Sequence, residues 1–391
     1  MRKIDARMVR NTQISRRAFI SRAGSLAFAS TMLGACGGVE GTANKPTATR
    51  DAVSHPKVAL DRIEFSNWPL YIDRKVIKDF EKRFDVDLHY VEDINDNSEF
   101  FAKVRQQLEQ GEPTGRDLVA LTDWMAARWI RLGYLEPIDK RNTPNVQKNL
   151  IEGLRSPVFD KDRTYTAPWQ SGITGIGYNR KVVGELKSMQ QLFDPQYKGK
   201  VTFLSDARDA TSLVMLMDGV KPEEATLDDV MAAIDKVDEA NAAGQVRRFT
   251  GNDYTSDLTK GNVVIAMAYA ADLIQLKADN PDLDFAVPEE GAVRWSDNMM
   301  IPAKAEHPYG AEVWMNYVYE PEVAAKITAY VGSISPVDGI RDIVAKTAPE
   351  IAENPLVFPD AETQARLSGY PDLAPADERQ MNERFAQISG G

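Results

Sequence analysis

Five short segments of the sequence place an aromatic ring, a carboxylate or both beside the end of a predicted strand. These segments hold Trp68 and Tyr71, Asp123 and Trp124, Asp206 and Asp209, Tyr269 and Asp272, and Trp295 and Asp297. Aromatic faces attract ammonium groups through the ring quadrupole. Carboxylates accept charge-assisted hydrogen bonds from the same groups. Because α/β proteins bind ligands at strand ends, the combination is typical of a site for an organic cation.

Most of these side chains also have a structural explanation that competes with binding. Core packing would account for Trp68 and for one of Trp124 and its neighbour Trp129. Helix capping would account for Asp206 and Asp209, and exposure to solvent at a strand end for Tyr269 and Asp272. Asp206 and Asp209, for example, have the spacing of a helix N-cap and a first-turn acid. The recurrence of the pattern at several strand ends, rather than any single residue, favours binding.

Other chemistry has little support in the sequence. It holds no Walker loop, no His-Glu-x-x-His and no Gly-x-Ser-x-Gly motif. The three His residues lack metal-ligand spacing, and Cys36 is the only cysteine. Gly172, Gly175 and Gly177 miss the dinucleotide-binding spacing and favour turns and close backbone packing. We therefore expect a binding protein without metal, cofactor or turnover, and an exported enzyme with a carboxylate pair stays an alternative.

The elements that must position these residues alternate along the chain. Strands are predicted at 60–65, 87–91, 117–121, 201–204 and 263–268, and helices at 76–84, 100–108, 207–217, 227–239, 308–319 and 322–330. Helices that connect successive strands are what parallel sheets require. Two such runs of similar size predict an α/β protein with two lobes and a ligand site between them.

The charge is distributed unevenly between the N-terminus and the rest of the chain. The 391 residues have a formal net charge of −11. Residues 1–35 contain seven basic residues and one acid, so the remainder has 40 basic and 57 acidic residues and a net charge near −17. An acidic chain without a long basic run argues against nucleic acid as a partner. The apolar stretch at 26–36 is shorter than the roughly 20 residues of a spanning helix.

The N-terminus has the features of an export signal. Its early basic part contains Ser15-Arg16-Arg17-Ala18-Phe19-Ile20, which resembles the twin-arginine signal. The weakly apolar stretch that follows ends in Leu33-Gly34-Ala35-Cys36, which resembles a lipobox. We predict that residues 1–35 are a signal peptide, that Cys36 is lipidated, and that 36–57 are an anchor and flexible tether. The protein would then lie in the periplasm or cell envelope, with the lipid as its only membrane contact.

From about residue 60 to 359 the chain resembles the spermidine/putrescine-binding proteins of ABC importers. The matching phrases are Asn67-Trp68-Pro69-Leu70-Tyr71-Ile72, Tyr90-Val91-Glu92-Asp93-Ile94-Asn95-Asp96-Asn97, Asp117-Leu118-Val119, Pro168-Trp169-Gln170-Ser171-Gly172, Ser205-Asp206-Ala207-Arg208-Asp209, Phe249-Thr250-Gly251-Asn252-Asp253-Tyr254 and Trp295-Ser296-Asp297-Asn298. The resemblance implies a two-lobed periplasmic-binding-protein fold of type II-like form, each lobe a mixed sheet flanked by helices. Residues 58–172 plus 271–306 would form lobe 1, and 173–270 plus 307–391 would form lobe 2.

The resemblance also implies a function and a site. A monomer would capture a polyamine such as putrescine or spermidine and deliver it to a membrane permease. Carried over by position, the residues expected to bind it are Trp68, Tyr71 and Tyr269 as aromatic walls, Thr122 and Trp124 as cleft lining, Asp206, Asp209, Asp272 and Asp297 as amine partners, and Ser335 at the rim. Another organic cation or an opine-like solute on the same fold stays an alternative, as does a role in sensing.

The sequence departs from the family pattern at three positions. Tyr269 stands where the family often has Trp, which makes the aromatic box smaller. Asp209 stands where some spermidine binders have Glu, which shortens the reach of the carboxylate. Asp123 stands where a small neutral residue is common. These departures keep the cation-binding class and leave open which amine is preferred.

Overall fold

The computed structural model describes residues 53–390, which belong to one compact unit. The predicted signal peptide, Cys36 and residues 36–52 lie outside the described residues. Within 53–390, no helix has both the length and the apolar character needed to cross a membrane. His55, placed in the flexible tether by the sequence, is held to the folded part, since its Nδ1 lies 2.6 Å from Glu312 Oε1.

The first lobe starts with a parallel sheet in the strand order β2-β1-β3. Its first elements are β1 (Arg62–Asn67), α1 (Arg74–Phe84), β2 (Asp87–Glu92), α2 (Asn97–Gln110), β3 (Leu118–Thr122) and α3 (Asp123–Leu132). Asp73 and Asp96 cap α1 and α2, because their carboxylates accept hydrogen bonds from backbone N–H groups of the first turns. Parallel pairing brings the ends of β1 and β3, and so Trp68 and Thr122, to one edge of the sheet.

The second lobe repeats this construction with the parallel order β8-β6-β7. Its elements are α5 (Arg180–Val183), η4 (Met189–Phe193), η5 (Pro195–Tyr197), β6 (Val201–Leu204), α6 (Ala207–Met217), η6 (Pro222–Glu224), α7 (Leu227–Ala242), β7 (Val246–Thr250), α8 (Tyr254–Thr259), β8 (Ile265–Tyr269), α9 (Ala270–Asp279) and β9 (Leu283–Ala286). Asp209 and Asp272 lie in the first turns of α6 and α9, directly after the ends of β6 and β8.

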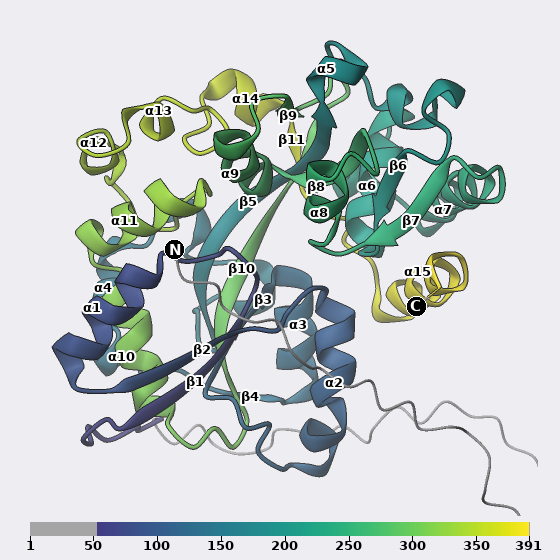
Figure 1. Cartoon of the computed structure of the whole chain (residues 1–391). Coiled ribbons are helices and arrows are strands. Elements are labelled where there is room, and N and C mark those ends of the chain that lie inside the picture. The colour runs from purple at the N-terminus through teal and green to yellow at the C-terminus, as the bar shows by residue number, and fades with distance from the viewer. Residues whose placement is uncertain (1–52, 391) are drawn as a thin grey trace, which may run out of the picture. The chain divides into compact units, whose positions relative to one another are not determined.

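Two long strands join the lobes. They are β5 (Thr166–Asn179) and β10 (Ala292–Pro302), which pair antiparallel with each other. The end of β10 pairs with β3 of the first lobe, whereas the second half of β5 pairs with β8 and β9 of the second. The β5–β10 pairing is irregular between Ser296 and Asn298, which places a bulge at Asp297. Both strands run from one lobe to the other in Figure 1.

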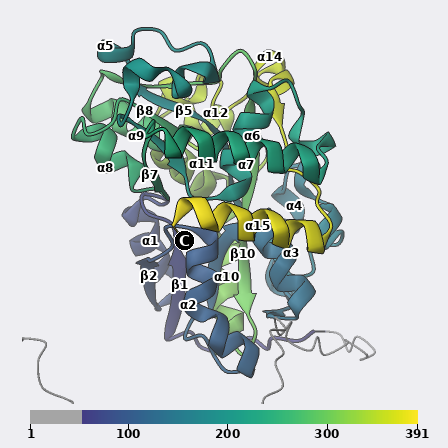
Figure 2. The same ribbon diagram turned by 90° about the vertical axis from the view of Figure 1, so that its right-hand side faces the viewer.

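The remaining elements distribute over both lobes. They are β4 (Leu135–Glu136), η1 (Lys140–Asn142), α4 (Pro144–Asn149), η2 (Glu152–Leu154), η3 (Val158–Asp160), α10 (Pro308–Val318), α11 (Pro321–Val331), α12 (Arg341–Val344), α13 (Pro349–Ala352), α14 (Ala361–Ala365), β11 (Leu367–Ser368) and α15 (Pro375–Ser389). β11 pairs with the start of β10. The C-terminal helix α15 contacts α7 and α6, and it runs below α7 in Figure 2.

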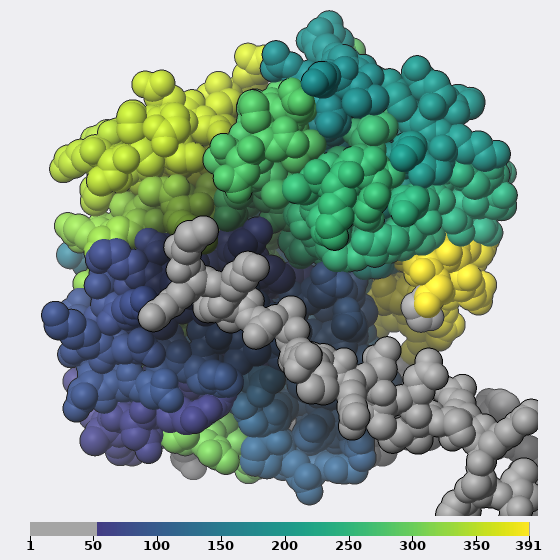
Figure 3. All heavy atoms as spheres, in the orientation of Figure 1, coloured from purple at the N-terminus to yellow at the C-terminus, as the bar shows by residue number. Residues whose placement is uncertain are grey.

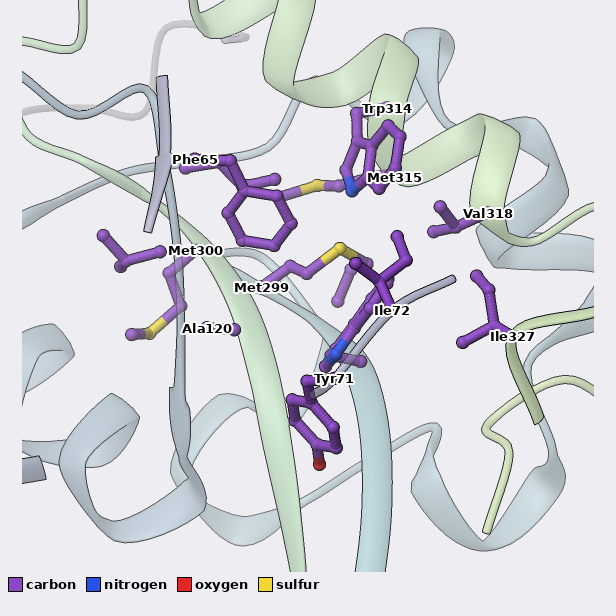
Figure 4. Packing of buried hydrophobic residues seen from close by; sticks show 14 of the residues in the cluster. Phe65, Tyr71, Ile72, Ala120, Met299, Met300, Trp314, Met315, Val318 and Ile327 are labelled. Carbon is purple, nitrogen blue, oxygen red and sulfur yellow. The ribbon is translucent and has the colours of Figure 1, made fainter. Parts of the chain in front are cut away.

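The two main hydrophobic cores define the lobes. One core consists mainly of buried apolar residues between Ile63 and Trp169 and between Met299 and Ala352. The other consists of buried apolar residues between Ile176 and Val293, together with Met381 and Phe385. Trp314 of α10 and Phe65 of β1 belong to the first core, where Met299 and Met300 of β10 join them (Figure 4). In Figure 3, most of the first lobe on the visible face is blue and purple, and the second is teal and green.

These cores differ from the partition that the sequence predicted. Residues 308–352 pack with lobe 1 rather than lobe 2, and most of 271–293 packs with lobe 2 rather than lobe 1. The difference arises because β10 passes from the second lobe to the first near residue 296. The chain then returns to the second lobe only after α13. By contrast, the predicted strands and helices themselves are confirmed to within a few residues.

Candidate functional site

A narrow pocket lies where both lobes and the shared strands meet. Its cavity volume is about 40 Å³. The residues that line it are Trp68, Pro69, Tyr71, Thr122, Asp209, Asn252, Tyr269, Ala271, Asp272, Trp295, Asp297 and Tyr370. Seven of the ten predicted ligand-binding residues are among them, brought together from segments up to 229 positions apart in the chain. The lining thus combines carboxylates with aromatic rings, as the sequence predicted.

Asp297 occupies the bulge of β10 and is held by the first lobe. Its Oδ1 accepts a hydrogen bond of 2.8 Å from Thr122 Oγ1, and its Oδ2 accepts one of 3.0 Å from Tyr71 Oη. Asn97 fixes Thr122 in turn, because its Nδ2 donates to Thr122 Oγ1 over 3.0 Å. Tyr71 lies at the edge of the first core, and its hydroxyl points away from Trp314 (Figure 4). The carboxylate therefore has a fixed orientation.

Asp272 is the corresponding carboxylate on the second lobe. Its Oδ2 accepts hydrogen bonds from Asn252 Nδ2 at 2.9 Å and from Tyr254 Oη at 2.5 Å. Tyr254 is itself fixed, since its hydroxyl accepts from the backbone N–H of Tyr269. Both of these hydrogen bonds engage Oδ2, and Asp272 is one of the residues that line the pocket.

Asp209 forms a third acidic position with different surroundings. Its Oδ1 accepts hydrogen bonds from Thr174 Oγ1 at 2.7 Å and Tyr370 Oη at 2.9 Å. Its Oδ2 accepts a further one of 3.1 Å from Tyr269 Oη. Three hydroxyl donors hold this carboxylate in one place and give that part of the pocket a wall of two tyrosine rings.

The aromatic walls depend on close backbone packing. Trp295 lies against Gly172 of β5, where a Cβ atom would be only 2.3 Å from Trp295 Cζ2. The ring of Tyr269 meets Trp295 edge-on, with centroids 5.6 Å apart. On the other side, Trp68 is fixed by a 3.0 Å hydrogen bond from its Nε1 to Ala120 O. The glycine stretch of β5 therefore serves close packing, as predicted, but lies in a strand rather than in turns.

Burial dominates the electrostatics of the pocket. It raises the pKa of Asp272 from 3.8 to about 6 and that of Asp297 to about 7. Burial and then the nearby charge of Asp206 also raise the pKa of Asp209. No Lys, Arg or His is among the residues that line this pocket in the described part of the chain. Such a group of desolvated carboxylates is stabilised by a ligand that brings positive charge.

Three predicted site residues lie outside the pocket lining. Asp206 caps α6 by accepting from the backbone N–H of Arg208, as its structural explanation predicted. Trp124 lies under Arg208, whose guanidinium carbon is 4.0 Å from its ring centroid. Of the two tryptophans in α3, Trp129 is the one buried in the core, and Trp124 is only partly buried. The side chain of Ser335 accepts from the backbone N–H of Val337 and stabilises a turn.

Five other lining residues were not among the ten predicted ligand-binding residues: Pro69, Asn252, Ala271, Trp295 and Tyr370. Asn252 lies in one of the phrases that carry the family resemblance, and Trp295 flanks Asp297, so both had a local signal. Tyr370 had none, because it follows β11 in a C-terminal region that looked polar and helical. Its position depends on the pairing of β11 with β10, which no local pattern indicates.

Comparison with known proteins places this geometry in a family. Residues 75–359 match the family of the bacterial extracellular solute-binding protein. The spermidine/putrescine-binding periplasmic protein 1 of Haemophilus influenzae is 25% identical over 348 residues, which cover 88% of this chain and 93% of that protein. The putrescine/cadaverine-binding protein of Pseudomonas aeruginosa is 27% identical over 355 residues, with coverage of 87% and 97%.

Solved structures agree with this assignment. A putative spermidine/putrescine ABC transporter from Listeria monocytogenes has a TM-score of 0.74 and 25% identity, and the match covers 84% of this chain and 98% of that one. The likeness spans both lobes and the strands that join them. The chain therefore has the two-lobed periplasmic-binding-protein fold and belongs to the family of bacterial extracellular solute-binding proteins.

Proposed function

We propose that this protein is the extracytoplasmic binding component of an ABC transporter and that its ligand is a linear polyamine of the putrescine/spermidine class. The observation that carries the proposal is the pocket itself, where Asp272 and Asp297 are fixed on opposite lobes between the rings of Trp68, Tyr269 and Trp295. Ammonium groups neutralise the carboxylates, and the methylene chain lies between the rings. The relatives named for spermidine, putrescine and cadaverine support the same ligand class.

The lining argues against the alternative ligands. An opine-like solute carries carboxylates, which need a cationic partner, and the described lining residues include no cation. No group of three or more acids, histidines or cysteines in residues 53–390 has the arrangement of a metal site.

Binding and transport are linked by closure of the lobes. Only the closed arrangement brings Asp297 and Asp272 into one pocket, so the ligand favours that state. The closed surface would then be recognised by the membrane permease. The protein would act as a monomer without catalytic turnover. The twin-arginine signal and lipidation at Cys36 belong to this proposal and lie outside the described residues.

Thermal unfolding of the purified protein tests the ligand class. Putrescine, cadaverine and spermidine are compared with butane-1,4-diol, succinate and opines at equal concentrations. A ligand at about 100 times its Kd stabilises the protein by about 2.7 kcal/mol, so at least one polyamine should raise the unfolding temperature by several degrees. The uncharged diol matches putrescine in length and should have no effect. An increase with succinate or an opine and none with any polyamine would contradict the proposal.

A further inference from the structure

A second cavity lies entirely within the first lobe. Its volume is about 310 Å³, within the range of roughly 300–1,000 Å³ that is usual for small-molecule sites. It is lined by parts of η1 and α4, the loop around η2 and η3, and the start of β5. None of its lining residues lines the pocket between the lobes. The proposed polyamine site therefore does not account for it.

The cavity wall contains a buried cation without a carboxylate partner. The Arg163 side chain donates from Nε to Leu154 O and from Nη1 to Thr166 Oγ1 and Asn298 Oδ1. Its Nη2 has no hydrogen-bond partner among residues 53–390, although only 8% of Arg163 is exposed. Nor does Arg163 form an ion pair with any of these residues; Asp160, for example, accepts hydrogen bonds from Thr166 instead.

The charges of Asp123 and Asp160 act on the desolvated Arg163 guanidinium without forming an ion pair with it, whereas transfer of an ion out of water is best repaid by a close partner of opposite charge. The backbone around Arg163 is also unusual, with a φ of 48° in the left-handed region. Nη2 of Arg163 thus remains available at the cavity for a direct bond to a ligand carboxylate.

The rest of the lining has the same sign of charge. Lys140 and Arg155 also line the cavity, whereas its one acid, Asp162, is exposed to solvent. Lys140 Nζ donates to the backbone carbonyl of Asp162 rather than to its carboxylate. Arg155 is paired with Glu152 at 3.0 Å, so Lys140 and Arg163 are the two lining cations without an ion pair among residues 53–390. This local charge favours an anion.

The remaining wall is apolar and sets the class of the anion. Ile138, Val146, Leu150 and Ala167 line the cavity beside the three cations. Inorganic phosphate would leave these side chains and most of the 310 Å³ without contacts. We propose that this cavity binds a small organic acid, whose carboxylate meets Arg163 and whose short apolar body fills the space against these four side chains.

Isothermal titration calorimetry of the purified protein with hexanoate tests this site. The titration is done in the presence of saturating putrescine, so that the pocket between the lobes is occupied if the proposed function is correct. Saturable binding of one hexanoate per protein is expected, with no binding of hexan-1-ol, which has the same chain without the charge. Equal binding of the two, no saturable binding of hexanoate, or binding of phosphate in its place would overturn the proposal.

Two variants locate the binding. Arg163→Gln removes the charge and should weaken hexanoate binding by at least about tenfold. Because loss of Arg163 could disturb the fold, Ala167→Met provides a second route, since it fills the cavity and leaves Arg163 in place. It should weaken binding similarly while the unfolding temperature confirms a native fold. Unchanged hexanoate affinity in folded Ala167→Met would show that the ligand binds elsewhere.

Discussion

At the scale of single residues, the pocket depends on carboxylates that hydrogen bonds from the protein hold in place. Asp297 uses both oxygens to accept from Thr122 and Tyr71, whereas both hydrogen bonds to Asp272 engage its Oδ2. The acids are therefore oriented before the ligand arrives, which lowers the entropic cost of binding. Asp209, held by three hydroxyls, mainly shapes the end of the pocket.

The change Asp272→Asn should weaken putrescine binding by at least about tenfold, which corresponds to about 1.4 kcal/mol. The reason is that it removes the charge that faces the ligand while it retains the size of the side chain. Isothermal titration calorimetry measures the effect. Asp279→Asn, an exposed acid on the same helix α9, is the matched control and should leave the affinity unchanged. Equal affinity in both variants would remove Asp272 from the site.

Polyamine affinity should also fall as the pH falls from 8 to 5.5. Burial raises the pKa of Asp272 to about 6 and that of Asp297 to about 7, so both take up protons in this interval. The alkylammonium groups stay charged, and each protonated acid must release its proton before it pairs with them. We expect a loss of about tenfold or more, measured by calorimetry across the interval. A constant affinity would show that these acids are already ionised in the free protein.

The same raised pKa values also make the stability of the folded protein depend on pH. An acid with a raised pKa keeps its proton in the native state when the unfolded chain has released it. These two acids therefore favour folding at about pH 4, and that contribution is lost as the pH rises toward 7. At pH 8 the ammonium groups of putrescine compensate for this lost contribution. The increase in unfolding temperature caused by putrescine should therefore be larger at pH 8 than at pH 5.5.

At the scale of elements, the long strand β10 supplies Trp295 and Asp297 to the pocket, and its neighbour β5 supports them. The bulge of β10 presents Asp297, and the glycines of β5 let the ring of Trp295 approach the backbone. The sequence phrases that carry Trp169, Gly172 and Asp297 were recognised, but the strands themselves were not predicted. The reason is that both strands are buried and contain Gly, Pro or polar residues, so they lack an alternating pattern.

The change Gly172→Ala should weaken polyamine binding by about tenfold. A Cβ atom would be 2.3 Å from the Trp295 ring, so the ring must move into or away from the pocket. Calorimetry with putrescine measures the loss, and the near-ultraviolet circular dichroism reports the displaced tryptophan. Gly153→Ala is the control, because nothing lies within 4 Å of its Cβ position. If Gly172→Ala binds as tightly as the control, the Trp295 ring does not form a wall for the ligand.

At the scale of the whole molecule, α15 connects the two lobes. The helix packs on the second lobe through Met381 and Phe385. Glu378 at its start contacts Arg208 of the second lobe at 2.9 Å and Arg131 of the first at 3.3 Å. Arg208 in turn stacks on Trp124 of the first lobe. These contacts join the lobes through residues that do not line the pocket, so under the proposed function they would favour the closed state.

The change Glu378→Gln should therefore weaken putrescine binding by a few-fold to about tenfold, although the pocket is unaltered. Its physical basis is the smaller fraction of closed protein once the charge that bridges Arg208 and Arg131 is removed. Stopped-flow measurement should find most of the effect in a faster dissociation rate. Glu383→Gln, an exposed acid on the same helix, serves as the control. A wild-type dissociation rate in Glu378→Gln would show that this bridge does not stabilise the closed state.

The sequence by itself determined the elements of each lobe and most of the pocket residues. Local periodicity encodes the strands and helices, and the acids and rings at the ends of parallel strands must meet at one edge. Seven of the ten residues that the family resemblance implied line the pocket. The tertiary structure decided the features that depend on pairing between distant segments. These are the point near residue 296 where β10 passes between the lobes, the position of Tyr370, and the presence of Trp295 rather than Trp124 in the pocket lining. Contacts between segments far apart in the chain set these features, and such contacts leave no period in the sequence.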